Sequence, residues 1–206
     1  MNWNIPNILT LLRLIAAPSV AIMFLYFHRP LADWFALILF VVAAFTDFLD
    51  GYLARAWKQE SKFGAMMDPI ADKAMVIIAL VVITGFSGMN PWILLPAVLI
   101  IFREVFVSGL REFLGETAGL LKVTNLAKWK TTVQMAAISV LFAKGAFEHY
   151  LIDRTNGDVL GLRTLELGAE ISWYLGIGLL WIAMVLTVLS GADYFGKSLP
   201  YLRDAP

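Results

Sequence analysis

The chain has 206 residues, of which 60% are hydrophobic and only 16% are charged, and its mean hydropathy is +0.75. A soluble domain carries about a quarter charged residues, so this composition excludes an ordinary water-soluble globule. Sixteen basic residues balance 16 acidic ones, and cysteine is absent. We therefore expect no nucleic-acid partner, no disulfide and no thiolate metal site.

Six apolar stretches are long enough to cross a bilayer, which takes roughly 17–25 residues of helix. In chain order they are Ile8–Tyr26, Trp34–Ala56, Phe63–Thr84, Trp92–Leu114, Thr132–Phe147 and Trp173–Leu189. Polar or turn-forming segments separate the first five, at residues 28–30, 58–61, 88–91 and 115–130. The sequence therefore predicts an all-α integral membrane protein with six transmembrane helices. At this length we expect residues 1–206 to form a single membrane-embedded domain.

The connections between these stretches differ in charge. The second-to-third connection carries Arg55, Lys58 and Lys62, and the fourth-to-fifth is also basic. The third-to-fourth has no charge, and the fifth-to-sixth, predicted as an external loop from Glu148 to Glu170, carries five acids against two arginines. Because cytoplasmic loops are enriched in Lys and Arg, we expect both termini on the cytoplasmic side of the inner (plasma) membrane.

A pattern of acidic and small residues runs across the second and third stretches. It reads D-x2-D-G-x2-A-R-x8-G-x3-D-x3-D, and its members are Asp47, Asp50, Gly51, Ala54, Arg55, Gly64, Asp68 and Asp72. An ionised side chain inside a bilayer costs roughly 3 kcal/mol or more, so such residues face a cavity and carry function. The pattern therefore predicts one polar cluster shared by two neighbouring helices.

The aspartates form two pairs that each share a helix face. Asp47 and Asp50 are three residues apart, and Asp68 and Asp72 are four apart. Two facing helices with paired carboxylates supply hard oxygen ligands, which suit Mg²⁺ or Mn²⁺ rather than zinc. Two such ions, about 3.5–4 Å apart, would serve phosphoryl chemistry.

Two other interpretations of the acids remain open. Arg55 and Lys73 could neutralise some of them in interhelical salt bridges, although this leaves others uncompensated. A divalent-cation transporter also places carboxylates in its spans. Against transport, the acids gather toward the cytoplasmic half of only two stretches rather than along a route.

The pattern resembles, at every position, the signature of the CDP-alcohol phosphotransferases. The segments NIPNILTLLRLIAAP, FREVFVSGLREFLGE and LAKWKTTVQM are also similar to those of bacterial members of this family, so the resemblance covers most of the chain to about Met135. It implies six transmembrane helices, commonly in a homodimer, and an active site open to the cytosol. It also implies CDP-diacylglycerol as the donor of a phosphatidyl group.

The resemblance further implies roles for the residues of the pattern. Asp47, Asp50, Asp68 and Asp72 match the metal ligands, with Asp72 as the general base. The cytidine pocket would be lined by Gly51, Ala54 and Gly64, and Arg55 would face the phosphates. Since the pattern contains no serine, histidine or cysteine nucleophile, we expect direct attack of an acceptor hydroxyl on the phosphatidyl phosphorus, with release of CMP.

Basic residues on the fourth and fifth stretches indicate which kind of acceptor alcohol the protein binds. Arg103 and Arg111 are eight residues apart, about two turns, and so share one helix face, while Lys128 and Lys130 begin the fifth stretch. This set suits an anionic acceptor such as glycerol 3-phosphate better than serine or choline. Inositol phosphate and phosphatidylglycerol are alternative acceptors, and the cytoplasmic bias of basic residues alone would also place cations here.

A polar stripe lies on the first stretch, where Asn7, Thr10 and Arg13 are spaced by three. Residues three apart lie on one face of a helix. The stripe either helps to close the pocket for CDP-diacylglycerol or anchors the helix at the interface.

Overall fold

The computed structural model describes residues 5–56, 61–120, 125–153 and 159–202. Of residues 6, 47–56, 116, 120, 125–128, 153, 159 and 160 it describes only the backbone. The elements in chain order are α1 (Ile5–Tyr26), α2 (Leu31–Ala56), α3 (Lys62–Phe86), α4 (Pro91–Leu114), the 3₁₀ turn η1 (Gly115–Leu120), α5 (Asn125–Asp153) and α6 (Val159–Leu202). Five of the helices contain a stretch long and apolar enough to span a bilayer, and α2 contributes the shorter apolar stretch Leu31–Thr46. The predicted all-α membrane fold is confirmed.

Local sequence explains where α3 begins and where α4 begins and ends. The Ser61 hydroxyl caps α3 by accepting a hydrogen bond from the Gly64 amide at 3.0 Å. The Asn90 side chain caps α4 in the same way, and Pro91 occupies its first turn. Gly115, with a φ of 53°, ends α4 in a conformation that favours glycine.

The predicted boundaries of the last two helices are wrong. α5 and α6 extend well beyond Thr132–Phe147 and Trp173–Leu189, and the described parts of the predicted loop Glu148–Glu170 are helical. The two helices pack against each other more extensively than any other pair. A Cβ on Gly168 would lie 3.2 Å from the Phe147 ring, so this glycine permits a close approach beyond the apolar stretches. Tertiary packing thus continues both helices into charged sequence.

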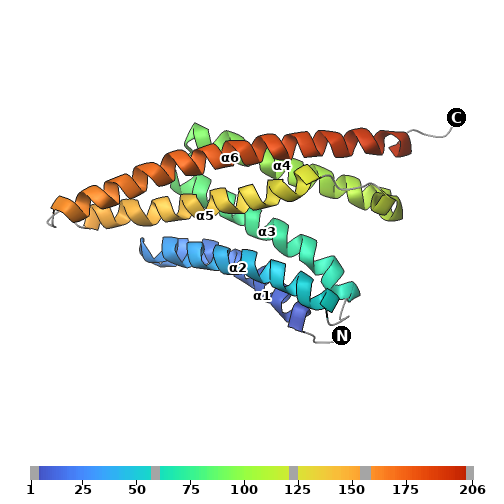
Figure 1. The fold of residues 1–206 in the computed structure, drawn as a ribbon, viewed down its shortest axis with the longest axis horizontal. Coiled ribbons are helices and arrows are strands. Elements are labelled where there is room, and N and C mark those ends of the chain that lie inside the picture. The colour runs from blue at the N-terminus through green and yellow to red at the C-terminus, as the bar shows by residue number, and fades with distance from the viewer. Residues whose placement is uncertain (1–4, 57–60, 121–124, 154–158, 203–206) are drawn as a thin grey trace.

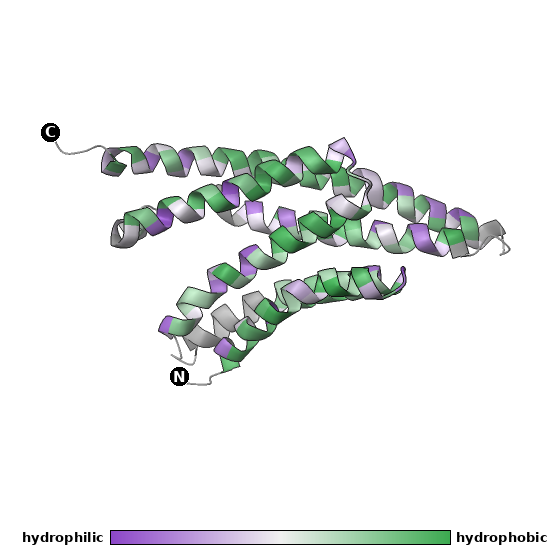
Figure 2. Ribbon diagram, turned by 180° about the vertical axis from the view of Figure 1, so that it is seen from behind, coloured by the Kyte–Doolittle hydropathy of each residue, from purple (hydrophilic) through white to green (hydrophobic). Residues whose placement is uncertain are grey.

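The helices form two arms that meet along the middle of the molecule (Figure 1). α1, α2 and the first half of α3 make one arm, and α4, α5 and α6 make the other. The arms diverge toward the end at which both chain termini lie. Figure 2 shows hydrophobic residues through the middle of the helices and hydrophilic ones concentrated toward their ends, as expected for spans of a bilayer.

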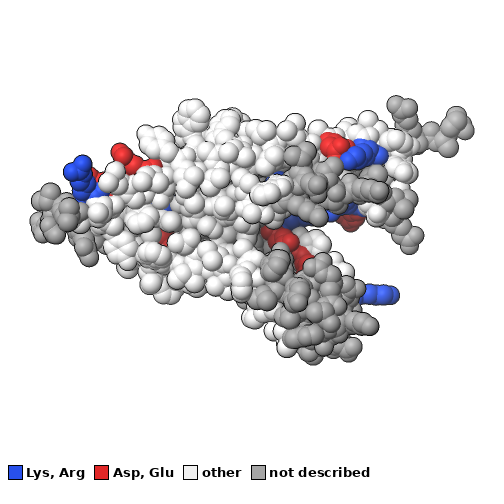
Figure 3. Space-filling model, viewed as in Figure 1, with Lys and Arg blue, Asp and Glu red and all other residues white. Residues whose placement is uncertain are grey.

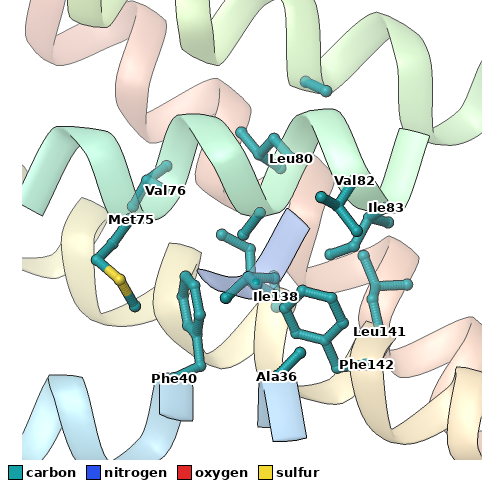
Figure 4. Close-up of a cluster of buried hydrophobic side chains, with 14 of the residues drawn as sticks. Ala36, Phe40, Met75, Val76, Leu80, Val82, Ile83, Ile138, Leu141 and Phe142 are labelled. Atoms are coloured by element: carbon teal, nitrogen blue, oxygen red, sulfur yellow. The ribbon is translucent and has the colours of Figure 1, made fainter. Parts of the chain in front are cut away.

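A core of buried side chains joins the two arms. Phe40 of α2, Leu80 of α3 and Phe142 of α5 are each at most 2% exposed and lie close together (Figure 4). Near the opposite end from the termini, Asp33 is buried in an ion pair with Arg29, whose guanidinium lies 5.4 Å from the centre of the Phe24 ring. The core and this pair hold the helices together away from the divergent end.

Candidate functional site

A charged cavity of about 330 Å³ lies between α3, α4 and α5, where the arms diverge. Figure 3 shows this hollow, with acidic and basic atoms on its walls. Its charged lining residues are Asp68, Asp72, Lys73, Arg103, Glu104, Arg111 and Lys130. The structure therefore brings together acids of the third predicted stretch and cations of the fourth and fifth.

Two carboxylates of α3 face side chains of α1. The Thr10 hydroxyl donates to Asp68 Oδ1 at 2.5 Å, and Arg13 Nη1 donates to Asp72 Oδ1 at 2.7 Å. Arg13 Nη2 also lies 3.6 Å from Asp68 Oδ1. Thr10 and Arg13 are buried, whereas the Asp68 and Asp72 side chains are 45% and 44% exposed. The polar stripe of α1 is thus in direct contact with the acidic pair.

Gly64 allows the first turns of α1 and α3 to approach each other. A Cβ at this position would lie 2.8 Å from Asn7 Oδ1 and 3.3 Å from Ser61 Oγ. Asn7 is itself buried and accepts a hydrogen bond from the Ser61 hydroxyl at 2.7 Å. Any larger residue at position 64 would displace this polar contact at one end of the site.

The opposite wall of the cavity is cationic. Arg103 Nη2 donates to Ser190 Oγ of α6 at 3.0 Å. The Arg111 guanidinium lies 5.1 Å from the centre of the Tyr194 ring, within the range of a cation–π contact. Both arginines line the cavity, as their spacing on one helix face predicts, and each is supported by a side chain of α6.

The site predicted from the sequence did not include Lys73, Glu104 or Ser108, which also line the cavity. Lys73, considered only as a neutralising charge, donates from Nζ to Ser108 Oγ at 2.5 Å. Glu104 is 6% exposed and its Oε1 accepts from Lys130 Nζ. An acid inside an otherwise apolar stretch was an available signal for Glu104, because such residues are costly in a bilayer. Ser108 carried no comparable signal.

The remaining predicted site residues lie outside the described side chains. They are Asp47, Asp50, Gly51, Ala54, Arg55 and Lys128. The backbone of α2 ends at Ala56 and α3 begins at Lys62, so Asp50 and Asp68 are each six residues from that connection. The two acidic pairs therefore occupy similar positions along consecutive helices.

The described donors fit a divalent cation. Asp68 and Asp72 lie one turn apart on the cavity wall and offer only carboxylate oxygens, the ligands preferred by Mg²⁺ and Mn²⁺. Among the residues with described side chains, no three His, Cys, Asp or Glu converge on one point. The α3 pair is thus the described half of the predicted four-carboxylate site.

A second cavity, of about 470 Å³, adjoins the first at Asp72, Val76 and Thr131. It lies between α2, α3 and α5, and most of its lining is apolar, including Val41 and Met135. A charged cavity and an apolar one therefore share a wall beside the acidic pair.

The fold and these cavities define a multi-pass membrane protein whose charged cleft opens at one end of a helical bundle. The model of the CDP-alcohol phosphatidyltransferase family matches residues 3–189, and the chain belongs to this family.

The relatives that carry the name CDP-diacylglycerol–glycerol-3-phosphate 3-phosphatidyltransferase include the following three. The protein of Cereibacter sphaeroides is 63% identical over 99% of both chains. That of Rickettsia bellii is 40% identical over 95% of both chains. That of Haemophilus influenzae is 38% identical over 99% of this chain and 98% of its own.

Proposed function

We propose that this protein transfers the phosphatidyl group of CDP-diacylglycerol to sn-glycerol 3-phosphate, giving phosphatidylglycerophosphate and CMP. The observation that carries this proposal is the junction of the two cavities at Asp72. A donor with acyl chains and a diphosphate needs apolar and charged walls side by side, and a phosphorylated acceptor needs cations. The names of relatives up to 63% identical over the whole chain support the same reaction.

The acidic residues form the reaction centre in this proposal. Asp47, Asp50, Asp68 and Asp72 would hold one or two divalent cations, Mg²⁺ or Mn²⁺. The bound metal would neutralise the donor diphosphate and the charge that develops on departing CMP. Asp72 accepts the proton of the acceptor hydroxyl as the hydroxyl oxygen bonds to the phosphatidyl phosphorus. The bond from that phosphorus to the CMP oxygen breaks in the same displacement.

The remaining site residues bind the two substrates. Gly51, Ala54 and Gly64 line the cytidine pocket with Asn7 and Thr10, and Arg55 faces the donor phosphates. The acceptor phosphate binds to the cationic set Arg103, Arg111, Lys128 and Lys130. Three of these four line the charged cavity, opposite the acidic pair of α3.

The proposal extends to the assembly and its place in the cell. Residues 1–206 form one catalytic domain, and two copies form a homodimer in the inner membrane. The charged cavity opens to the cytoplasm, where glycerol 3-phosphate and the metal ion are available. Support for this orientation comes from the basic sequence of two connections, because the described helix ends that they join lie at the same end as the cavity.

A panel of acceptors tests the reaction. Purified protein in detergent is supplied with CDP-diacylglycerol, Mg²⁺ and labelled glycerol 3-phosphate, inositol phosphate, phosphatidylglycerol or serine. We expect CMP and labelled lipid with glycerol 3-phosphate, and little with the others. A lipid product formed from another acceptor but not from glycerol 3-phosphate would overturn the assignment.

Metal removal tests the reaction centre. Thorough chelation with EDTA should abolish turnover, and Mg²⁺ or Mn²⁺ should restore it. Asp68→Asn should weaken metal binding, measured by calorimetry, in protein that still inserts in the membrane. Full turnover under chelation would contradict the metal site. Mg²⁺ flux through reconstituted protein without CMP release would instead favour a cation transporter.

A further inference from the structure

Glu104 is a buried carboxylate set among cations. It is 6% exposed, and its Oε1 accepts from Lys130 Nζ of α5 and from Arg103 Nη1 at 3.3 Å. Among the described residues, it is the single acid that α4 and α5 contribute to the charged cavity. One carboxylate oxygen therefore joins cations from two helices.

Because these side chains are buried, the charges of Glu104, Lys130 and Arg103 depend on one another for stabilisation. Lys130 is only 7% exposed, and a cation withdrawn from water costs several kcal/mol unless an opposite charge compensates it. Arg103 is further fixed by Ser190, and a Cβ on Gly191 would lie 2.8 Å from Arg103 Cγ. The charges of Lys130 and Arg103 are thus partly compensated, and Arg103 is held in place, before any substrate enters.

Two other cations of the cavity have a different environment. Arg111 lies against the Tyr194 ring, and Lys73 donates to the Ser108 hydroxyl. Within the described part of the chain, neither lies in an ion pair with a carboxylate. Glu104 and Asp72 act on Lys73 only from beyond ion-pair distance. The charges of Lys73 and Arg111 are therefore less fully compensated than that of Lys130 when an anion enters from the open end.

We propose that Glu104 is a positioning residue that divides the cations of the acceptor site into two roles. It holds Lys130 and Arg103 as a compensated wall that shapes the cavity. Lys73 and Arg111 then contact the anionic group of the acceptor. This inference rests on the proposed function and revises its cationic set. Lys130 and Arg103 form a wall held by Glu104 and do not contact the phosphate, and Lys73 joins Arg111 as a phosphate contact.

A double-mutant cycle with Lys130→Gln, Glu104→Gln and the double variant tests whether Lys130 acts through Glu104. Lys130→Gln leaves Glu104 undercompensated, so we expect the KM for glycerol 3-phosphate to rise about tenfold, the size of one charge-assisted hydrogen bond. The KM for CDP-diacylglycerol should stay unchanged. The double variant removes both charges and should return the acceptor KM to within about threefold of wild type.

The two roles give opposite results in the double variant. If Lys130 contacted the phosphate directly, the acceptor KM would stay raised in the double variant, and the proposal would be overturned. Glu104→Gln alone leaves two cations uncompensated and should lower kcat and the melting temperature rather than raise the acceptor KM. Wild-type kcat and melting temperature in that variant would also overturn the proposal. Should either single variant fail to fold, the double variant alone decides.

Controls separate this result from failure of the proposed function. Arg111→Ala should raise the acceptor KM roughly tenfold or more, both alone and in the double variant. Lys197→Gln breaks a half-exposed pair with Asp193 on α6, outside the cavity, and should change neither KM. Turnover of the wild-type protein with glycerol 3-phosphate reports on the reaction itself. Only the cycle reports on Glu104.

Discussion

Arg13 brings a positive charge from α1 to both carboxylates of α3. Its two terminal nitrogens lie 2.7 Å from Asp72 Oδ1 and 3.6 Å from Asp68 Oδ1. A planar guanidinium can orient two carboxylates at once, which the point charge of a lysine cannot do. In the proposed mechanism, Arg13 would therefore orient the Asp72 carboxylate for proton transfer.

Arg13→Gln separates orientation from metal binding. Loss of charge-assisted contacts of about 1.5–3 kcal/mol should lower kcat roughly tenfold to hundredfold. The affinity for Mn²⁺, measured by calorimetry without substrate, should not fall, because the variant removes a cation from beside the acids. Arg13→Lys should recover only part of kcat. A parallel fall in kcat and metal affinity would instead make Arg13 a residue that builds the metal site.

At the scale of single residues, the sequence predicted which side chains line the cavity better than it predicted their contacts. The cost of charge in a bilayer singled out Asp68 and Asp72, and helix periodicity placed Arg103 and Arg111 on one face; all four line the same cavity. The partners of these residues depend on how helices far apart in the chain meet. The contacts of α1 with the acids of α3, and of Glu104 with Lys130, could not be predicted from periodicity within one helix.

Among the helices, α6 shapes the site without contributing charge to the cavity. Ser190 accepts from Arg103, and Tyr194, one turn later, lies beneath Arg111. Gly191, between them, provides the space that the Arg103 side chain occupies. The position of the cationic wall therefore depends on close packing between α4 and α6.

Gly191→Ala tests this dependence. The added Cβ would lie 2.8 Å from Arg103 Cγ and 3.2 Å from its Nε, so the arginine must move. We expect a loss of about 1–3 kcal/mol in stability from overpacking and a higher KM for glycerol 3-phosphate. Gly178→Ala on the same helix is the matched control, because a Cβ there meets no atom within 4 Å. Equal melting temperatures and acceptor KM values for the two variants would contradict this role.

The apolar stretches of the sequence predict the ends of some helices better than those of others. Helices α1 to α4 begin and end within a few residues of the predicted stretches because turn-forming residues such as Asn90 and Pro91 mark their ends. α5 and α6 exceed their predicted lengths because charged residues interrupt the apolar pattern without breaking a helix. The mutual packing of these helices, including the contact of Gly168 with Phe147, is information that composition does not contain.

For the whole molecule, both termini lie at the end where the arms diverge (Figure 1), and the charged cavity opens at that end (Figure 3). Because successive helices cross the bilayer in opposite directions, an even number of them puts both termini on the same side. The basic connections predict that this side is cytoplasmic. A fluorescent reporter that matures only in the cytoplasm should therefore be active when fused after Pro206. It should be inactive when inserted near Gly157. The opposite pattern would place the cavity on the wrong side for a cytosolic acceptor.

The buried core that joins the two arms has a consequence for the surrounding lipid. Phe40, Leu80 and Phe142 fill the region between the cleft and the far end, where Asp33 is buried beside Arg29. In the proposed reaction, donor and product would then use the same mouth, and each turnover would return its product to the leaflet that supplied the donor. Synthesis enriches one leaflet in a more anionic lipid and leaves the other unchanged. A separate flipping step must therefore distribute this lipid, or its descendants, across the bilayer.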